Sequence, residues 1–352
     1  MNSSQPPAPG AFQPLIIEKI REEAKDFKTF FFRNGHGLHY EAGQFITLVD
    51  KSGQQEIRRS YSIVSSPSIK EPLAIGVKRL DNGFFSRKLF DRARPGDELV
   101  TSGVSGFFRL PENMDVYKNF FFFAAGSGIT PILSLVKTIL LAYPEKNIIL
   151  VYSNHSAKTT AYYEYLKITA NQYAEQLNLK FLFSTAPDLR NARLNRELLL
   201  DLLKIHKADR KESFFYTCGP ESYMRLVIFL LLEEGYPKDH IKKEDFNPGN
   251  KKLSLRMPPD KNNYRVQLTL GEKTTDFPVQ YPDTILQAAK RIKLMLPYSC
   301  ETGKCGTCAA RYLSGKVWHS NNEVLTDEDL LKGFVLTCTG HPQSDNLVLE
   351  IA

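Results

Sequence analysis

The sequence predicts a multidomain protein: an antiparallel β-barrel, then a Rossmann-like α/β domain with a parallel sheet, then a smaller α+β domain. Its 352 residues exceed what one ordinary hydrophobic core organises. Short strand-like segments give way to alternating strands and helices, and four of the five cysteines lie after residue 299. We therefore expect a disordered tail (1–10), a barrel (11–112), an α/β domain (113–247), a linker (248–261) and a cysteine-containing domain (262–352).

The first domain is predicted to be an antiparallel barrel. Strand-length hydrophobic segments at residues 45–49, 61–64, 74–78 and 98–102 are separated by Gly, Pro and Asp turns. Residues 87–91 are predicted to be helical and follow the segment Gly83-Phe84-Phe85-Ser86. The free N–H groups and positive end of a helix start can bind a phosphate, although so short a pattern also occurs by chance.

The second domain is predicted to contain a parallel sheet with helices on both faces, because strands and helices alternate. The predicted strands are residues 120–125, 148–152, 181–184 and 214–217, and the predicted helices are residues 131–141, 160–174, 196–203 and 221–234. After the first strand, Gly126-Ser127-Gly128 forms a Gly-rich turn of the type that binds dinucleotides. Thr130 suits the N-cap and Pro131 the first position of the helix that follows.

One cysteine stands apart from the others, directly after the fourth predicted strand of this domain. Cys218 is followed by Gly219 and Pro220, and ligands bind at the carboxyl edge of parallel strands. Cys218 is therefore a candidate site residue, although a lone cysteine is more often a small, buried, apolar side chain.

The remaining cysteines have the spacing of a [2Fe–2S] cluster site. Cys300, Cys305 and Cys308 follow the pattern C-x4-C-x2-C, and 29 residues separate Cys308 from Cys338. Glycines within the loop let its backbone N–H groups approach the cluster sulfides. A structural zinc site is the alternative, but zinc ribbons pair two cysteine knuckles and this loop has one. Two strands and a helix near residues 284–292 are predicted before the cysteines.

Charge and hydropathy argue against a nucleic-acid-binding, a secreted or a membrane-spanning protein. The net charge is +7, but from Lys261 onward ten Lys or Arg balance ten Asp or Glu, so residues 1–260 hold the excess. This is milder than the basic stripe of a nucleic-acid-binding protein, and suits a pyrophosphate-binding segment or an ordinary solvated surface. We find no secretory signal pattern and no apolar run near the ~20 residues of a membrane span. We therefore expect a cytoplasmic protein without nucleic-acid or membrane partners.

Four motifs, taken in order, resemble those of the ferredoxin–NADP reductase superfamily. They are Arg59-Ser60-Tyr61-Ser62, the Gly83 segment, residues 124–131 (AAGSGITP) and residues 216–220 (YTCGP). The sequence LPYSCETGKCGTC and the segment that ends at Cys338 resemble plant-type ferredoxins, which have a β-grasp fold. The whole chain resembles the reductases of oxygenase systems, such as phenylacetyl-CoA epoxidase and ring-hydroxylating enzymes, and the reductases of hybrid-cluster proteins.

This resemblance implies that the chain binds FAD, NAD(P)H and a [2Fe–2S] cluster. The residues implied for FAD are Arg59, Ser60, Tyr61, Ser62, Gly83, Phe84, Phe85, Ser86 and Phe246. The residues implied for the nicotinamide dinucleotide are Gly126, Gly128, Thr130, Pro131, Cys218, Gly219 and Pro220. The implied catalytic residues are Ser62, Cys218 and Glu244, and the implied cluster ligands are Cys300, Cys305, Cys308 and Cys338. The ring of Phe246 is expected to cover the flavin until nicotinamide displaces it.

The implied function is electron transfer from NAD(P)H through FAD and the cluster to a protein acceptor, the oxygenase component. A hybrid-cluster protein as acceptor, or a non-enzymatic role in electron carriage or assembly, are the alternatives. NADPH-using relatives often carry a phosphate-binding arginine at the position of His155. Lys158 could bind the phosphate in its place, so NADPH is slightly favoured over NADH. In plant ferredoxin–NADP reductases the corresponding aromatic residue ends the chain. Here the Glu244-Asp245-Phe246 motif lies at the start of the predicted linker. The polar linker predicts few contacts between the third domain and the other two.

Overall fold

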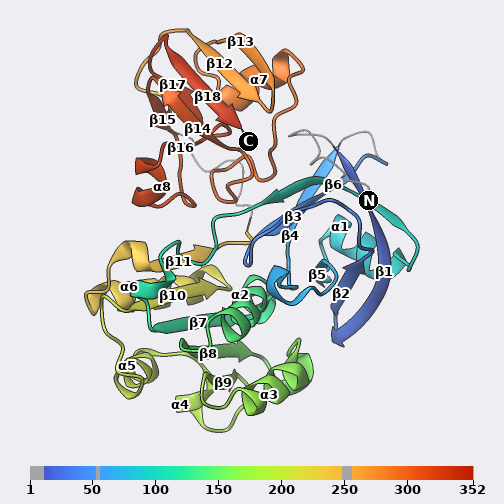
Figure 1. Ribbon diagram of the computed structural model, residues 1–352, viewed down its shortest axis with the longest axis vertical. Coiled ribbons are helices and arrows are strands. Elements are labelled where there is room, and N and C mark those ends of the chain that lie inside the picture. The colour runs from blue at the N-terminus through green and yellow to red at the C-terminus, as the bar shows by residue number, and fades with distance from the viewer. Residues whose placement is uncertain (1–11, 53–55, 248–255, 352) are drawn as a thin grey trace.

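The computed structural model describes residues 12–52, 56–247 and 256–351, which form three domains (Figure 1). The third domain contacts both of the others, through a hydrogen bond to the barrel and ion pairs to the α/β domain. Within the described ranges, no helix is long and apolar enough to cross a membrane. The predicted tail and residues 248–255 of the predicted linker lie outside the described residues.

Six antiparallel strands form the barrel in the order β4–β3–β6–β1–β2–β5. Their bounds are β1 (Gln13–Ala24), β2 (Phe27–Phe32), β3 (Phe45–Asp50), β4 (Ile57–Ser62), β5 (Ala74–Lys78) and β6 (Glu98–Ser105). A bridge between Ile63 and Ile75 joins the two edges of the sheet and closes the barrel. Inward-pointing residues such as Ile17, Phe30 and Leu48 form its core. The predicted antiparallel barrel is thus confirmed.

The pattern of hydrophobic residues does not predict β1 and β2. β1 is a long strand in which only Leu15 and Ile17 are fully buried, so its hydrophobic signal is weak. β4 begins at Ile57, earlier than predicted, because the polar residues at its start pair with β3. The helix after Gly83 also begins earlier, as α1 (Phe84–Arg87), and continues as a π-helical turn (Lys88–Arg92).

Five parallel strands form the sheet of the second domain in the order β11–β10–β7–β8–β9. The strands are β7 (Asn119–Ala125), β8 (Asn147–Asn154), β9 (Leu177–Phe183), β10 (Ser213–Cys218) and β11 (Ile241–Glu244). The helices are α2 (Ile129–Ala142), α3 (Tyr163–Gln172), α4 (Leu189–Ala192), α5 (Arg196–Ile205) and α6 (Glu221–Glu233). This arrangement confirms the predicted parallel sheet.

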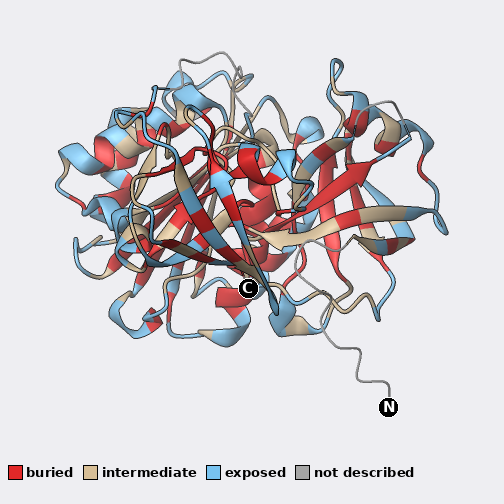
Figure 2. Ribbon diagram, turned by 90° about the horizontal axis from the view of Figure 1, so that it is seen from above, coloured by how far each residue is buried: buried red, intermediate tan, exposed pale blue. Residues whose placement is uncertain are grey.

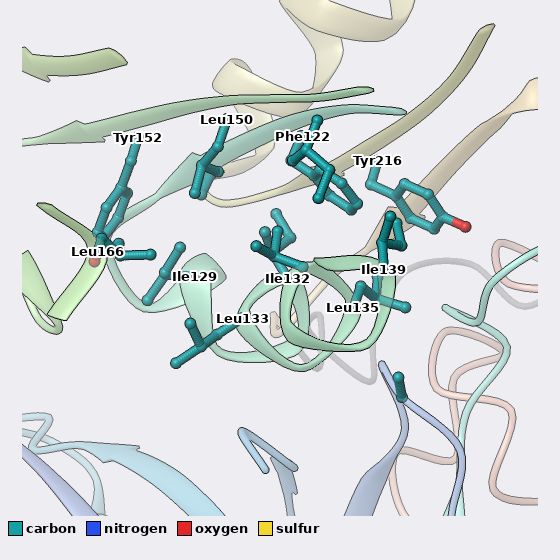
Figure 3. Close-up of a cluster of buried hydrophobic side chains, with 14 of the residues drawn as sticks. Phe122, Ile129, Ile132, Leu133, Leu135, Ile139, Leu150, Tyr152, Leu166 and Tyr216 are labelled. Atoms are coloured by element: carbon teal, nitrogen blue, oxygen red, sulfur yellow. The ribbon is translucent and has the colours of Figure 1, made fainter. Parts of the chain in front are cut away.

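Each face of this sheet has its own hydrophobic core, because successive residues of a strand point to opposite faces. Phe122 of β7 packs with α2 and α3, whereas its neighbour Phe123 packs with α5 and α6. Figure 3 shows the first core, in which Ile129, Ile132 and Ile139 of α2 lie against the sheet. Figure 2 shows that buried residues are concentrated in the strands and the helix faces that cover them.

The start of α2 differs from the prediction. The helix begins at Ile129 with Gly128 as its N-cap, so Thr130 and Pro131 occupy its second and third positions. The Thr130 side chain is buried, and its hydroxyl donates to Ser127 O at 2.9 Å instead of capping the helix. The preceding glycines already coil as a 3-10 turn, so the extended conformation of a usual N-cap occurs before them.

The third domain has a mixed sheet in the order β13–β12–β18–β14–β16 and a two-stranded sheet of β15 and β17. The strands are β12 (Tyr264–Leu270), β13 (Lys273–Val279), β14 (Ala309–Ser314), β15 (Val317–His319), β16 (Phe334–Leu336), β17 (Gly340–Pro342) and β18 (Leu347–Ile351). The helices are α7 (Ile285–Arg291) and α8 (Asp327–Leu331). Thr284 caps α7 where the sequence predicts a helix, and its hydroxyl accepts from Gln287 N at 3.2 Å.

Short 3-10 turns connect several of these elements. They lie at Pro67–Ile69, Met114–Val116, Gly126–Gly128, Ala157–Thr159 and Lys238–His240.

Candidate functional site

Strand β4 carries the motif of residues 59–62, and its side chains alternate between two faces. On one face Arg59 is exposed, and the Tyr61 ring centroid lies 6.1 Å from that of Phe85 in α1. On the other face Ser62 is buried. The structure thus brings Tyr61 and Phe85 together, two of the residues predicted to bind FAD.

The three predicted catalytic residues meet where β4 approaches the carboxyl ends of β10 and β11. Ser62 Oγ donates a hydrogen bond to Glu244 Oε2 at 3.3 Å. Glu244 lies beside Cys218 in the parallel pairing of β11 with β10. Three elements that are distant in the sequence therefore place a hydroxyl, a carboxyl and a thiol at one edge of the sheet.

Burial sets the protonation state of this group. It raises the pKa of the Glu244 carboxyl from 4.5 to about 8, against a smaller opposing effect of the hydrogen bond from Ser62. Burial, with Glu244 and Asp245 nearby, raises the pKa of the Cys218 thiol well above 9.0. At pH 7 the site therefore presents a carboxylic acid and a thiol instead of two anions.

The Gly-rich turn after β7 packs directly against the end of β10. A Cβ on Gly128 would lie 2.0 Å from Cys218 O, and a Cβ on Gly219 would lie 2.8 Å from Ala125 Cβ. Gly126 has a φ of +56°, in the left-handed region that favours glycine. This close packing brings the predicted nicotinamide-binding glycines and Cys218 together at the carboxyl edge of the sheet, where ligands bind in such folds.

The predicted phosphate-binding segment folds as a tight turn before α1. Ser86 Oγ accepts a hydrogen bond from Leu80 N at 3.2 Å and donates one to Gly83 O at 3.1 Å. Phe84 is 56% exposed at the first position of the helix. Ser86 therefore stabilises the turn itself, and the role of this segment in binding FAD stays a prediction.

Other predicted residues lie around the same edge of the α/β domain. Phe246 follows β11 and is exposed, and Pro220 is the N-cap of α6. His155 follows β8, with its Nδ1 3.2 Å from Ser184 Oγ, and Lys158 is exposed. Their roles in binding cofactors also stay predictions.

The four clustered cysteines converge in the third domain. Cys300 lies within hydrogen-bonding distance of Cys305 and Cys338, and Cys338 lies within hydrogen-bonding distance of Cys308 as well. Three thiols from one loop and a fourth from just after β16 fit a [2Fe–2S] cluster. No three Cys, His, Asp or Glu side chains in the described part of the chain surround a single metal ion. A [2Fe–2S] cluster does not need such a group, because its four thiolates are divided between two irons.

The cluster loop is docked against both other domains. Ser299 Oγ, next to the first cluster cysteine, lies 2.9 Å from Ser60 Oγ of β4. Lys304 Nζ, within the loop, lies 3.2 Å from Asp245 Oδ2, just after β11. The expectation of few contacts between the third domain and the other two is therefore wrong, because the composition of a linker does not determine which surfaces meet.

Arg58 is a residue of this junction that the sequence motif does not include. Its side chain is 4% exposed, and its Nη1 donates to Tyr298 O at 3.1 Å. The signal that could have found it is strand alternation, which places Arg58 on the same face of β4 as Ser60 and Ser62.

Three family models match the chain, one for each domain. They are the oxidoreductase FAD-binding domain over residues 14–110, the oxidoreductase NAD-binding domain over residues 122–228 and the 2Fe-2S iron-sulfur cluster binding domain over residues 268–343. These matches confirm the predicted FAD, nicotinamide and [2Fe–2S] cofactors.

Similarity to known proteins extends over nearly the whole chain. The chain is 28% identical to a component of the 1,2-phenylacetyl-CoA epoxidase of Escherichia coli, over 96% of this chain and 97% of that protein. It is 30% identical to the ferredoxin reductase component of 3-ketosteroid-9-alpha-monooxygenase of Rhodococcus rhodochrous, over 96% of each. The structure of phthalate dioxygenase reductase is similar with a TM-score of 0.59 and 25% identity, over 97% of this chain and 98% of that one. The chain therefore belongs to the family of ferredoxin reductases, oxidoreductases that here join an FAD-binding, an NAD-binding and a [2Fe–2S]-binding domain.

Proposed function

We propose that this protein is the reductase component of an oxygenase, which oxidises NAD(P)H and delivers electrons through FAD and the [2Fe–2S] cluster to a partner oxygenase. The observation that carries the proposal is the docking of the cluster loop on β4, where Ser299 Oγ lies 2.9 Å from Ser60 Oγ. The epoxidase and monooxygenase named in the two relatives support an oxygenase as the acceptor.

The side chains at the edge of the parallel sheet have distinct tasks in this proposal. FAD held by Tyr61 of β4 and Phe85 of α1 would supply the conversion between two-electron hydride transfer and the single-electron transfers that a [2Fe–2S] cluster requires. Cys218 is buried and protonated, which supports a role in orienting the nicotinamide ring by contact and not as a nucleophile. Glu244 holds a proton at pH 7, and Ser62 Oγ lies 3.3 Å from its carboxyl. This pair can hold a proton beside β4 without a buried negative charge, and such a charge forms only when the proton is released.

One face of β4 links the two ends of the proposed route. Ser62 contacts Glu244 at the nicotinamide-binding edge, and Ser60, two residues earlier, contacts the cluster loop. This arrangement supports electron transfer within one molecule, with no diffusing carrier between the hydride step and the cluster.

The sequence and structure also support NADPH as the electron donor and the cytoplasm as the location of the protein. Lys158 is exposed beyond β8, and its ammonium group could bind the 2′-phosphate, which supports NADPH over NADH. A cytoplasmic location is supported by the nicotinamide donor.

The proposed function is tested by anaerobic reduction of the purified holoprotein with NADPH and, separately, NADH. Absorbance follows the flavin and EPR follows the reduced cluster. We expect flavin reduction first, then the cluster signal, and turnover when a partner oxygenase is added. A cluster that stays oxidised after the flavin is reduced contradicts the proposal.

A further inference from the structure

Arg58 is a buried cation at the junction between the barrel and the third domain. Its side chain is 4% exposed, and its Nε lies 2.6 Å from Glu56 Oε1. An arginine is seldom so buried unless its charge is paired and its donors are satisfied. The neighbouring Arg59 points to the opposite face of β4 and is exposed.

Tyr298 of the third domain receives two further contacts of Arg58, whose guanidinium also lies 5.6 Å from the ring centroid of Phe12. Arg58 Nη1 donates to Tyr298 O at 3.1 Å, and the guanidinium carbon lies 3.8 Å from the Tyr298 ring centroid. A guanidinium that stacks on a ring and also donates a hydrogen bond fixes both the position and the orientation of its partner. Tyr298 precedes Cys300 by two residues, so this contact reaches the start of the cluster loop.

The third domain holds the same segment from its own side. Lys290 Nζ of α7 lies 3.7 Å from the Tyr298 ring centroid and 2.7 Å from Glu301 Oε2. Tyr298 is therefore contacted by one cation from its own domain and one from the barrel. Of the two, the contact with Arg58 is the one that crosses the junction.

Ion pairs at the rim of the junction are solvated, in contrast to Arg58. In the pair of Lys332 and Glu112 the side chains are 36% and 82% exposed. In the pair of Lys238 and Asp327 they are 69% and 64% exposed. Exposed ion pairs contribute little to stability, because water and salt screen them. Alignment of the cluster loop thus depends on buried contacts.

We propose that Arg58 is a positioning residue: by stacking on Tyr298 it holds the cluster-binding loop against β4 and so sets the rate of electron transfer from flavin to cluster. This inference rests on the proposed function and assigns a specific residue to its second step. Lysine cannot replace Arg58 fully, because a compact ammonium group lacks the planar fork that stacks and donates at once.

The test compares Arg58→Ala, Arg58→Lys and Tyr298→Leu in the full chain, loaded with FAD and cluster. Tyr298→Leu removes the ring from the opposite side of the contact, so it tests the inference even if Arg58→Ala does not fold. Lys332→Ala is the matched control, since it removes an exposed cation from the same junction. Iron and flavin analysis verifies the cofactor content of each variant. Anaerobic stopped-flow and freeze-quench EPR then measure flavin reduction and cluster reduction separately.

We expect cluster reduction to slow at least about tenfold in Arg58→Ala and Tyr298→Leu. A tenfold slower rate corresponds to an activation free energy that is ~1.4 kcal/mol higher. Flavin reduction by NAD(P)H keeps its wild-type rate, Arg58→Lys lies between, and Lys332→Ala behaves as the wild type. Cluster reduction at the wild-type rate in Arg58→Ala or in Tyr298→Leu overturns the inference. Equal slowing of flavin reduction and cluster reduction also overturns it. A wild-type protein whose flavin is reduced but whose cluster is not refutes the proposed function instead, and the inference with it.

Discussion

Replacing Glu244 with glutamine tests how burial controls the protonation state of the site. Glutamine keeps the size and the polar contacts of the protonated carboxyl but cannot titrate. In the wild type, burial raises the pKa of Glu244 to about 8. At pH 7 most molecules then carry the proton, because the pH lies below this pKa.

The same shift makes the stability of the fold depend on pH. Because the pKa of Glu244 in the folded protein lies above its ordinary value of 4.5, the unfolded chain releases this proton first as the pH rises. The contribution of the protonated carboxyl is fully present below pH 4.5 and is lost as the pH rises toward about 8. The loss is ~1.4 kcal/mol per pH unit, or about 5 kcal/mol over the whole range.

Two measurements on Glu244→Gln and the wild type check this reasoning. Urea unfolding of the holoproteins between pH 4.5 and about 8 should show a steeper loss of stability in the wild type than in the variant. Stopped-flow flavin reduction by NAD(P)H should fall above pH ~8 in the wild type and lack this inflection in the variant. Parallel stability curves, or an inflection that persists in Glu244→Gln, would refute the assignment of this proton to Glu244.

Three further predictions concern other residues of the site. Cys218→Ala should keep both cofactors but slow flavin reduction, by up to about 100-fold if the nicotinamide moves by ~1 Å, as stopped-flow measures. Lys304→Met and Asp245→Asn should be non-additive in urea unfolding by about 0.5–3 kcal/mol, because the two side chains are 15% and 9% exposed and in contact. Lys158→Ala should lower kcat/KM for NADPH and leave that for NADH unchanged in steady-state assays, and equal losses for both would contradict the proposed donor.

The fold could be predicted largely from the period of the hydrophobic residues. The segment of phenylalanines in β7 is hydrophobic throughout because both faces of its sheet are covered, which is the pattern of a buried parallel strand. β1 escaped prediction because most of its residues are not buried and its place depends on pairing with β2 and β6. The N-cap predicted at Thr130 is wrong because the glycines before it already form a helical turn.

The candidate site could be predicted where chemistry is encoded locally. The cysteine spacing defines a loop that brings its own thiols together, and the Gly-rich turn needs residues without a Cβ against Cys218 O. The position of Arg58 is different, since its partner Tyr298 is 240 positions later in the chain. No local pattern contains that contact, because it depends on how two finished domains meet.

The order of electron transfer is tested most directly by oxygenase turnover with Cys338→Ser, which removes the proposed cluster ligand that comes from outside the loop. The variant and the wild type are compared with NAD(P)H as donor and either ferricyanide or the partner oxygenase as acceptor, and iron analysis measures the cluster content. The account predicts that Cys338→Ser still reduces ferricyanide through the flavin but no longer supports the oxygenase. Oxygenase turnover at the wild-type rate by a variant that lacks the cluster would contradict it.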